Sequence, residues 1–204
     1  MRLVLLGPPG AGKGTQAQRL VAALNVPHLS SGQLLREAVA AGTTIGREAK
    51  PIMERGELVP DALIGEMVAD RIKQKEAEGG FVLDGYPRTL AQAEMLDRAL
   101  GERGMKLDAV LHIDVEEAAL LKRILQRAAE AESRGEAVRT DDDPVVFEKR
   151  MARYRAETAP LIAYYRKARK LKTVDGGQPV DRVTEELLAA IGIGESARSK
   201  APGK

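Results

Sequence analysis

A glycine-rich segment near the start of the chain combines residue types that bind phosphate. Residues 7–16 read GPPGAGKGTQ and follow a short apolar run, RLVLL, that predicts a buried strand. Glycines let backbone N–H groups approach a phosphate, and the N-terminus of the helix expected next adds positive potential. Lys13 adds a point charge suited to the β- and γ-phosphates of a nucleoside triphosphate. The predicted triphosphate contacts are Gly10, Ala11, Gly12, Lys13, Gly14 and Thr15.

The spacing of this loop differs by one residue from the common phosphate-loop pattern, GxxxxGK[ST]. Gly14 follows Lys13 directly, and the hydroxyl comes one position later, at Thr15, which we expect to contact phosphate or magnesium. The alternative is an ordinary glycine-rich turn with an incidental lysine. The flanking strand and helix patterns favour the phosphate loop, which by itself does not separate kinases from ATPases or GTPases.

A second motif, FVLDGYPRT at residues 81–89, places charged groups after another apolar run. Asp84 ends this run, and at the carboxyl edge of a parallel sheet a carboxylate can hold magnesium-bound water near the phosphate loop. Its alternative role is to cap the turn that follows. Pro87 restricts the backbone before Arg88, whose planar guanidinium suits a bidentate contact with phosphate.

Together, the two motifs resemble the adenylate kinase family of nucleoside monophosphate kinases, and the likeness covers residues 2–180 with the motifs in the family's order. The resemblance implies reversible transfer of the terminal phosphoryl group of MgATP to AMP, giving two ADP. It also implies Mg²⁺, held through water near Asp84 and Thr15. Because the chain has no Cys, we expect no zinc. Such a transfer needs mainly charge neutralisation, and the anionic phosphate of AMP is itself the nucleophile, so no general base is required.

The resemblance also implies an AMP site. Gln92 corresponds to the residue that reads the adenine edge, and its amide offers both a donor and an acceptor. Ser31 corresponds to a hydroxyl that caps a helix and touches the base, while Arg36 is expected to reach the AMP phosphate. Plain helix capping is the alternative role for Ser31, and an ordinary helix end is the alternative for residues 57–59. The expected AMP contacts are Ser31, Arg36, Glu57, Leu58, Val59, Gly85, Tyr86, Pro87, Arg88, Gln92, Arg139 and Arg150.

Three further residues are expected to contact ATP. Arg123 and Arg127 are four residues apart, so both point from one face of a helix. The resemblance implies that Arg123 stacks on the ATP adenine and that Arg127 contacts the ATP phosphates. The segment VDGGQPV resembles the loop whose backbone receives the adenine, which places Gln178 at that contact.

The arginines on either side of a charged segment are assigned to both nucleotides. By resemblance, Arg139 and Arg150 bridge ATP and AMP, and Asp141 and Asp142 orient them. We interpret Arg134 as part of a solvated helix face, which is the usual role of a charge run. The predicted catalytic set is Lys13, Asp84, Arg88, Arg127, Arg139 and Arg150.

The elements that must position these residues alternate between strands and helices. Short apolar runs bounded by Gly or Asp predict strands from Arg2, Phe81, Ala109 and Leu171, and VPHLSS predicts a weaker fifth. Longer stretches with helical spacing lie between them. This order predicts an α/β protein with a three-layer P-loop fold around a central five-stranded parallel sheet.

Two segments interrupt the alternation. Residues 30–59 contain two helical patterns with no strand between them, which predicts a small helical insertion, and the resemblance implies that this insertion binds AMP. Residues 128–142 are charged and nearly free of large apolar groups, and they predict a short lid, hinged near Ala128 and Asp142, that keeps water from the γ-phosphate. The predicted core domain comprises residues 1–29, 60–127 and 143–191, and residues 192–204 are expected to form a flexible tail.

Composition excludes several other classes of protein. With 32 Lys and Arg against 30 Asp and Glu, the net charge of +2 gives no reason to expect nucleic acid or anionic membranes as partners. The chain has no Cys, which excludes disulfides and a thiolate zinc site in the lid. We see no signal-peptide pattern and no apolar run of membrane-spanning length, so we expect a cytoplasmic monomer.

Three alternative functions remain open at this point. A related enzyme acting on UMP or CMP is the nearest, but Ser31 and Gln92 favour adenine because pyrimidine-directed relatives carry Ala and Asn at the matching positions. A nucleotide-dependent regulatory protein would use the same phosphate loop, but no guanine-reading NKxD string occurs. An RNA-binding module is disfavoured because two Phe and four Tyr offer few groups for base stacking.

Overall fold

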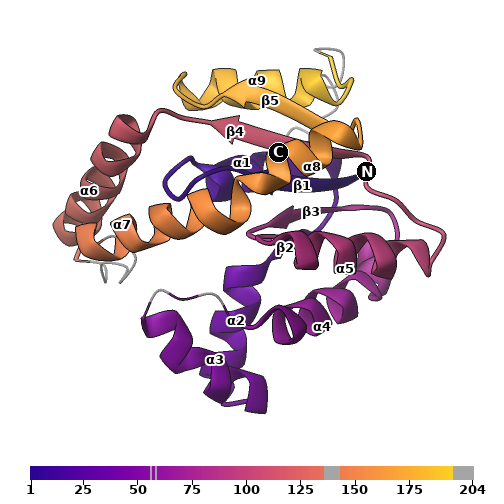
Figure 1. Cartoon of the computed structure of the whole chain (residues 1–204). Coiled ribbons are helices and arrows are strands. Elements are labelled where there is room, and N and C mark those ends of the chain that lie inside the picture. The colour runs from indigo at the N-terminus through magenta and orange to yellow at the C-terminus, as the bar shows by residue number, and fades with distance from the viewer. Residues whose placement is uncertain (56, 58, 136–142, 195–204) are drawn as a thin grey trace, which may run out of the picture.

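The centre of the molecule is a sheet of five parallel strands. A computed structural model describes residues 1–55, 57, 59–135 and 143–194, and in it the strand order is β2-β3-β1-β4-β5 (Figure 1). The strands are β1 (Arg2–Leu6), β2 (His28–Ser30), β3 (Phe81–Asp84), β4 (Ala109–Asp114) and β5 (Leu171–Asp175). Each of the five runs that the sequence predicts as a strand is one, including the short run within VPHLSS.

Helices connect these strands and cover both faces of the sheet. The α-helices are α1 (Lys13–Leu24), α2 (Ser31–Ala40), α3 (Thr44–Glu54), α4 (Asp61–Ile72), α5 (Leu90–Gly101), α6 (Glu117–Ser133), α7 (Pro144–Arg153), α8 (Pro160–Lys167) and α9 (Val180–Ala190). A 3₁₀ turn, η1 (Lys75–Ala77), and a π-helical segment, η3 (Tyr154–Thr158), complete the described elements. Across the described part of the chain, no helix is both long and apolar enough to cross a membrane.

Alternating side chains of the central strand enter two separate cores. Val4 and Leu6 of β1 join a cluster built with helices α2 to α5 and α8. Leu3 and Leu5 join a second cluster built with α1, α6, α7 and α9. A parallel strand buried on both faces in this way holds its carboxyl end rigidly between two layers of helices. The three layers confirm the predicted α/β P-loop fold.

Helices α2 and α3 follow one another with no strand between them and are in direct contact beside the sheet (Figure 1). Thr43 caps α3, because its side chain accepts a hydrogen bond from the Gly46 N–H at 3.0 Å. Gly46 is required where the two helices meet, since a β-carbon there would lie 2.0 Å from the carbonyl oxygen of Ala38. The backbones of α2 and α3 therefore approach more closely than any larger residue allows.

The segment predicted as a lid begins differently from the expectation. Helix α6 runs without a break through Ala128 to Ser133, so no hinge lies at Ala128. The reason is local, since the sequence AAEAES is rich in the strong helix formers Ala and Glu, and its charge does not prevent an exposed helix. Residues 136–142 lie outside the described part of the chain, so the lid itself stays a prediction.

The helical stretch from Pro144 to Lys167 is divided by a π-helical segment. Between α7 and α8, the five residues of η3 adopt a π-helix, and the Ala159 N–H donates to the Tyr154 carbonyl oxygen, five residues earlier, at 2.8 Å. Single π-turns inside helices often occur at functional sites because they shift the direction of the side chains that follow. Here the π-turn ends at Thr158, which faces the site described next.

Candidate active site

The predicted phosphate loop connects β1 to α1 and borders a cavity. Gly10 and Gly12 have φ angles of 83° and 88°, a conformation that residues with a β-carbon rarely adopt. The cavity has a volume of about 590 Å³ and we call it the phosphate-loop cavity. Its polar and loop residues include Gly7, Gly10, Gly12, Lys13, Gly14, Thr15, His28, Asp84, Arg88, Arg127, Arg150, Arg153 and Thr158. The loop residue Ala11 is instead buried, with 3% of its surface exposed.

Lys13 lies inside this cavity and holds the loop together. Its Nζ donates to the carbonyl oxygens of Gly7 and Pro8, at 2.8 Å in each case. Burial lowers the pKa of Lys13 to about 8, an effect that the charge of Asp84 opposes and the neighbouring arginines reinforce. Positive charge is therefore concentrated here, where an anion would stabilise it.

Asp84 lies at the carboxyl end of β3, as predicted, and faces the start of α1. Its Oδ2 lies 3.7 Å from His28 Nε2, and only 15% of the Asp84 side chain is exposed. Burial raises the pKa of this carboxyl, but the neighbouring His28 and Lys13 outweigh burial and hold the pKa below its usual value. Asp84 is therefore ionised at neutral pH.

The donor set here fits magnesium better than a permanently bound metal. Among the described residues, no three His, Cys, Asp or Glu side chains come close enough together to hold a metal ion. Mg²⁺ usually keeps several waters and takes its remaining ligands from one or two carboxylates and from substrate phosphates. One carboxylate, Asp84, and the Thr15 hydroxyl beside the same cavity match that pattern.

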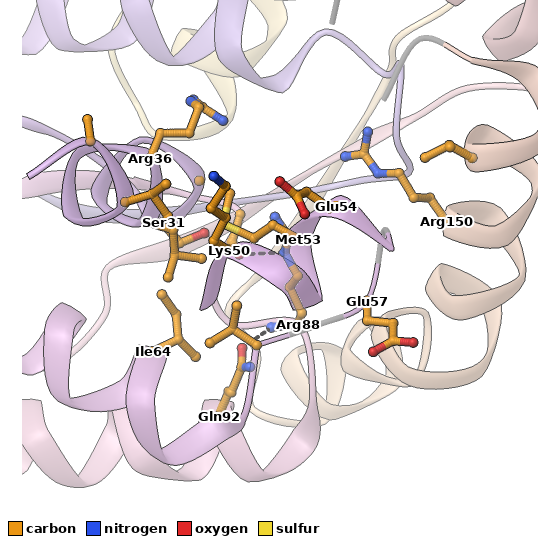
Figure 2. Close-up of a pocket in the computed structure, with 17 residues that line it drawn as sticks. Ser31, Arg36, Lys50, Met53, Glu54, Glu57, Ile64, Arg88, Gln92 and Arg150 are labelled. Carbon is orange, nitrogen blue, oxygen red and sulfur yellow. Dashed lines mark hydrogen bonds between the residues drawn. The ribbon is translucent and has the colours of Figure 1, made fainter. Parts of the chain in front are cut away.

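A second cavity, of about 610 Å³, lies between the helical insertion and the sheet (Figure 2). We call it the insertion cavity. Its apolar wall is formed by Leu35, Val39, Met53, Val59 and Ile64. Its polar residues are Ser31, Arg36, Lys50, Glu54, Glu57, Arg88, Gln92 and Arg150. A flat apolar ring with a charged group at one end would match this distribution.

The two cavities meet at a set of shared residues. Gly32, Arg36, Gly85, Arg88 and Arg150 line both of them. Three guanidinium groups therefore border the passage between the cavities, and each is suited to bind phosphate oxygens in pairs. From the sequence, we expect Arg36 and Arg88 to contact the AMP phosphate and Arg150 to bridge the two nucleotides.

Three hydrogen bonds hold Arg88, two through its backbone and one through its side chain. Its N–H donates to Gln92 Oε1 at 2.7 Å, and its carbonyl oxygen accepts from the Thr158 hydroxyl at 2.8 Å. Its side-chain Nε donates to the Gly85 carbonyl oxygen at 2.8 Å. These three hydrogen bonds restrict where the guanidinium can lie at the passage.

Gln92 is 2% exposed and lies on the first turn of α5. Thr89 caps this helix by accepting from the Gln92 N–H at 3.1 Å. The Gln92 Nε2 donates to Asp61 Oδ1 at 2.6 Å, and the Thr89 hydroxyl donates to Asp61 Oδ2 at 2.8 Å. Both ends of the Gln92 amide are thus engaged by the protein, which the sequence does not predict.

Ser31 lies at the insertion cavity, but the capping role predicted for it is wrong. The capping residue of α2 is Ser30, whose side chain accepts from the Gln33 N–H at 3.3 Å. Ser30 has an extended backbone and Ser31 is already helical, so only Ser30 can cap. The Ser31 hydroxyl instead donates to the Gly85 carbonyl oxygen at 2.7 Å and so links α2 to the loop after β3.

The remaining predicted AMP residues differ in how close they lie to the insertion cavity. Glu57 and Val59 line it, whereas Leu58 lies outside the described residues. Pro87 lines the phosphate-loop cavity. Tyr86 is 2% exposed and belongs to the core. Its hydroxyl donates to the Gln92 carbonyl oxygen, so its side chain helps to position Gln92 and does not line either cavity.

The residues predicted to contact the ATP base lie beyond the phosphate-loop cavity. Arg123 donates to the Gly176 carbonyl oxygen at 2.8 Å, and Gln178 donates to Glu186 Oε1 at 2.9 Å. Neither is among the described residues that line the two cavities, although Arg127 does line the phosphate-loop cavity. Arg139, Asp141 and Asp142 lie outside the described residues.

Several residues of the site were missed from the sequence. His28, Arg153 and Thr158 line the phosphate-loop cavity, and Asp61 binds Gln92 from behind. Arg153 follows Arg150 by three residues, so helical spacing could have indicated it. Nothing in the sequence marks the others, because their partners come from distant segments.

Comparison with known proteins agrees with this geometry. A family model described as adenylate kinase matches residues 5–170. An adenylate kinase of Methylobacterium radiotolerans is 55% identical over 191 residues, covering 94% of this chain and 96% of that protein. Adenylate kinases of a Chelativorans species and of Mesorhizobium japonicum are 54% and 52% identical, and they cover 92% and 97% of this chain. With the two joined cavities and this similarity over nearly its full length, the chain belongs to the adenylate kinase family.

Proposed function

We propose that the protein catalyses reversible transfer of the terminal phosphoryl group from MgATP to AMP, giving two ADP. One observation carries this proposal, namely that two cavities of nearly equal size meet at Gly32, Arg36, Gly85, Arg88 and Arg150. Direct transfer between two nucleotides requires donor and acceptor phosphates in one place and in line. Family membership supports the same reaction, and ATP, AMP and ADP are its expected partners.

Each nucleotide is assigned to one cavity. The ATP phosphates would lie in the phosphate-loop cavity against Lys13 and Thr15, with Arg123 and Gln178 positioning the loop that receives the adenine. AMP would occupy the insertion cavity, with its base against the apolar wall and beside Gln92. Its phosphate would reach the arginines of the passage.

The chemistry requires no proton transfer by the protein. An anionic oxygen of the AMP phosphate attacks the γ-phosphorus of ATP, and the bond from that phosphorus to the bridging oxygen breaks. The electron pair of this bond stays on the β-phosphate, which leaves as part of ADP. Lys13, Arg36, Arg88 and Arg150 stabilise the charge that spreads over the transferred group. Magnesium bound to the phosphates would neutralise part of their charge, and Asp84 would hold it through water.

The domain assignment extends this proposal. Residues 30–59 would form the AMP-binding insertion, and residues 128–142 the lid that follows Arg127 and precedes Arg150. Arg139 would enter the site from this lid and contact both nucleotides. Closure over both nucleotides would exclude water from the γ-phosphate, which otherwise would be lost to hydrolysis.

The test is the formation of ADP from MgATP with AMP, CMP, UMP or GMP as acceptor, beside a control without acceptor. We expect turnover with AMP and little with the other three. Preference for a pyrimidine monophosphate would assign the chain to the related UMP/CMP activity. Hydrolysis of ATP at the same rate without any acceptor would contradict transfer altogether.

A further inference from the structure

The side-chain amide of Gln92 is held in one orientation by partners that cannot exchange roles. Its Oε1 accepts from the Arg88 backbone N–H at 2.7 Å, and its Nε2 donates to Asp61 Oδ1 at 2.6 Å. A backbone N–H can only donate, and a carboxylate can only accept. Turning the amide over would bring two donors together at Arg88 and two acceptors together at Asp61. The structure therefore fixes which end of the amide is oxygen and which is nitrogen.

Asp61 is itself fixed, so its constraint on Gln92 is rigid. It is the first residue of α4, and its second oxygen accepts from the Thr89 hydroxyl at 2.8 Å. The same hydroxyl oxygen accepts from the Gln92 backbone N–H at 3.1 Å, which closes a ring of hydrogen bonds through the three side chains. Because Gln92 is only 2% exposed, water cannot readily replace these partners.

The fixed amide keeps one donor and one acceptor position for a ligand. An amide oxygen has two lone pairs and an amide nitrogen has two hydrogens, and the protein engages one of each. Gln92 borders the insertion cavity, beside its apolar wall (Figure 2). A 6-aminopurine offers a donor at its amino group and an acceptor at N1, whereas a 6-oxopurine offers an acceptor at O6 and a donor at N1. A 6-oxopurine would therefore need the amide turned over.

We propose that Asp61 determines specificity for the 6-amino group of the acceptor nucleotide. By fixing the Gln92 amide, it makes the insertion cavity favour a 6-aminopurine monophosphate and disfavour a 6-oxopurine monophosphate. Asp61 is a positioning residue, because it acts through Gln92 and not by contact with the nucleotide. The inference rests on the proposed function, in which AMP occupies this cavity.

The variant Asp61→Asn tests the proposal with little change in shape. An asparagine side chain can accept from the amide nitrogen or donate to the amide oxygen. In this variant only the Arg88 backbone N–H still opposes turning the amide over. IMP is the matched probe, because it differs from AMP only in the groups at C6 and N1. With saturating MgATP, kcat/KM is measured for AMP and for IMP. We expect the preference for AMP over IMP to fall roughly tenfold, a loss typical of one buried hydrogen-bond mismatch.

Two further variants separate positioning from general damage. Asp70→Asn removes the same charge from the same helix, but the Asp70 side chain is 74% exposed and pairs with Lys73 on the surface, so the preference should not change. Gln92→Leu removes the amide itself and should also reduce the preference. Thermal unfolding of all three variants checks that the fold is kept, and KM for MgATP in Asp61→Asn should match that of the original protein.

The outcomes distinguish this inference from the proposed function. If Asp61→Asn lowers activity with AMP and IMP in equal proportion, or leaves their ratio unchanged while Gln92→Leu reduces it, Asp61 does not set specificity. If Gln92→Leu also leaves the ratio unchanged, Gln92 does not read the base, and both assignments fail. If the original protein transfers no phosphoryl group to AMP, the proposed function itself is wrong.

Discussion

The phosphate-loop cavity and the insertion cavity have similar volumes, about 590 and 610 Å³, but their walls are made of different residue types. The first is built from loop backbone and charged or polar groups, among them Lys13, His28 and Asp84. The second has an apolar wall from the insertion helices and an amide, Gln92, that the protein holds from behind.

This difference indicates a division of work between the two halves of the site. In the proposed assignment, the phosphate charge would be neutralised where the loop backbone approaches the ligand, and the flat base would be selected where the helices provide packing surface. Arg36, Arg88 and Arg150 border both cavities, so they would serve both the phosphates in the first cavity and the acceptor in the second. Substitutions at the passage should therefore stop the reaction, whereas substitutions around the insertion cavity should change which acceptor is used.

Arg88→Ala should have the largest effect, because it removes a guanidinium from the passage while leaving both cavities in place. We expect kcat to fall by about a thousandfold, as for other arginines in phosphoryl transfer. Steady-state kinetics with MgATP and AMP measure the change, with thermal unfolding as a check on the fold. Arg98→Ala, at an exposed position on α5, is the control and should be near normal. Near-normal turnover in Arg88→Ala would contradict its role.

Thr158→Val should have the next largest effect, because it removes the hydroxyl that binds the Arg88 carbonyl oxygen. We expect kcat to fall roughly ten- to thirtyfold, since the buried carbonyl loses its partner and the arginine loses part of its alignment. Thr158→Ser keeps the hydroxyl and should restore most of kcat. Equal losses in the two variants would show that packing at the π-turn, and not the hydrogen bond, is what matters.

The charge of Lys13 should make ATP binding depend on pH. Its pKa of about 8 in the free protein means that raising the pH from 7 to 9 neutralises most of the ammonium, so affinity for MgATP should fall roughly tenfold. Bound phosphate favours the charged form, so binding at pH 9 should take up a proton. Titration calorimetry in buffers of different ionisation enthalpy measures this uptake. Lys13→Arg, whose side chain stays protonated, should show none.

Glu57→Gln should have the smallest effect, although Glu57 borders the insertion cavity. Its side chain is 42% exposed and pairs with Arg55 at 2.9 Å, so its charge is well screened by solvent. We expect KM for AMP to change by less than about threefold, because an exposed ion pair contributes little. A large rise in KM would mean that this carboxylate contacts the nucleotide directly, and the division between the cavities would need revision.

The fold could be predicted almost completely because its signals are local. Each strand is a short run that ends at Asp or Ser or just before Gly, and each helix between the strands has apolar residues at helical spacing. The failures occur where two local signals compete. Ser30 and Ser31 are both able to cap, and only the backbone of the folded chain decides between them. At α6, helix propensity outweighed the polar character that suggested a hinge near Ala128.

The site could be predicted only in part, and the missing part has a common cause. The phosphate loop and the segment around Arg88 each carry their chemistry in a few consecutive residues. The groups that hold them do not, since Asp61 reaches Gln92 across 31 residues and Thr158 reaches Arg88 across 70. The π-turn that ends at Thr158 has no pattern of its own in the sequence. Such contacts become visible only when the chain is folded.

The hydrogen bonds that Lys13 makes within its own loop affect the rate at which a product can leave the site. A phosphate that binds Lys13 has to compete with the carbonyl oxygens of Gly7 and Pro8, which lie 2.8 Å from its Nζ. When that phosphate departs, the same carbonyls receive the ammonium, so a buried cation is not left without a partner. In many enzymes the release of product limits turnover. Because the carbonyl oxygens of Gly7 and Pro8 can replace the phosphate as partners of Lys13, the barrier to release would be lower in both directions of the reaction.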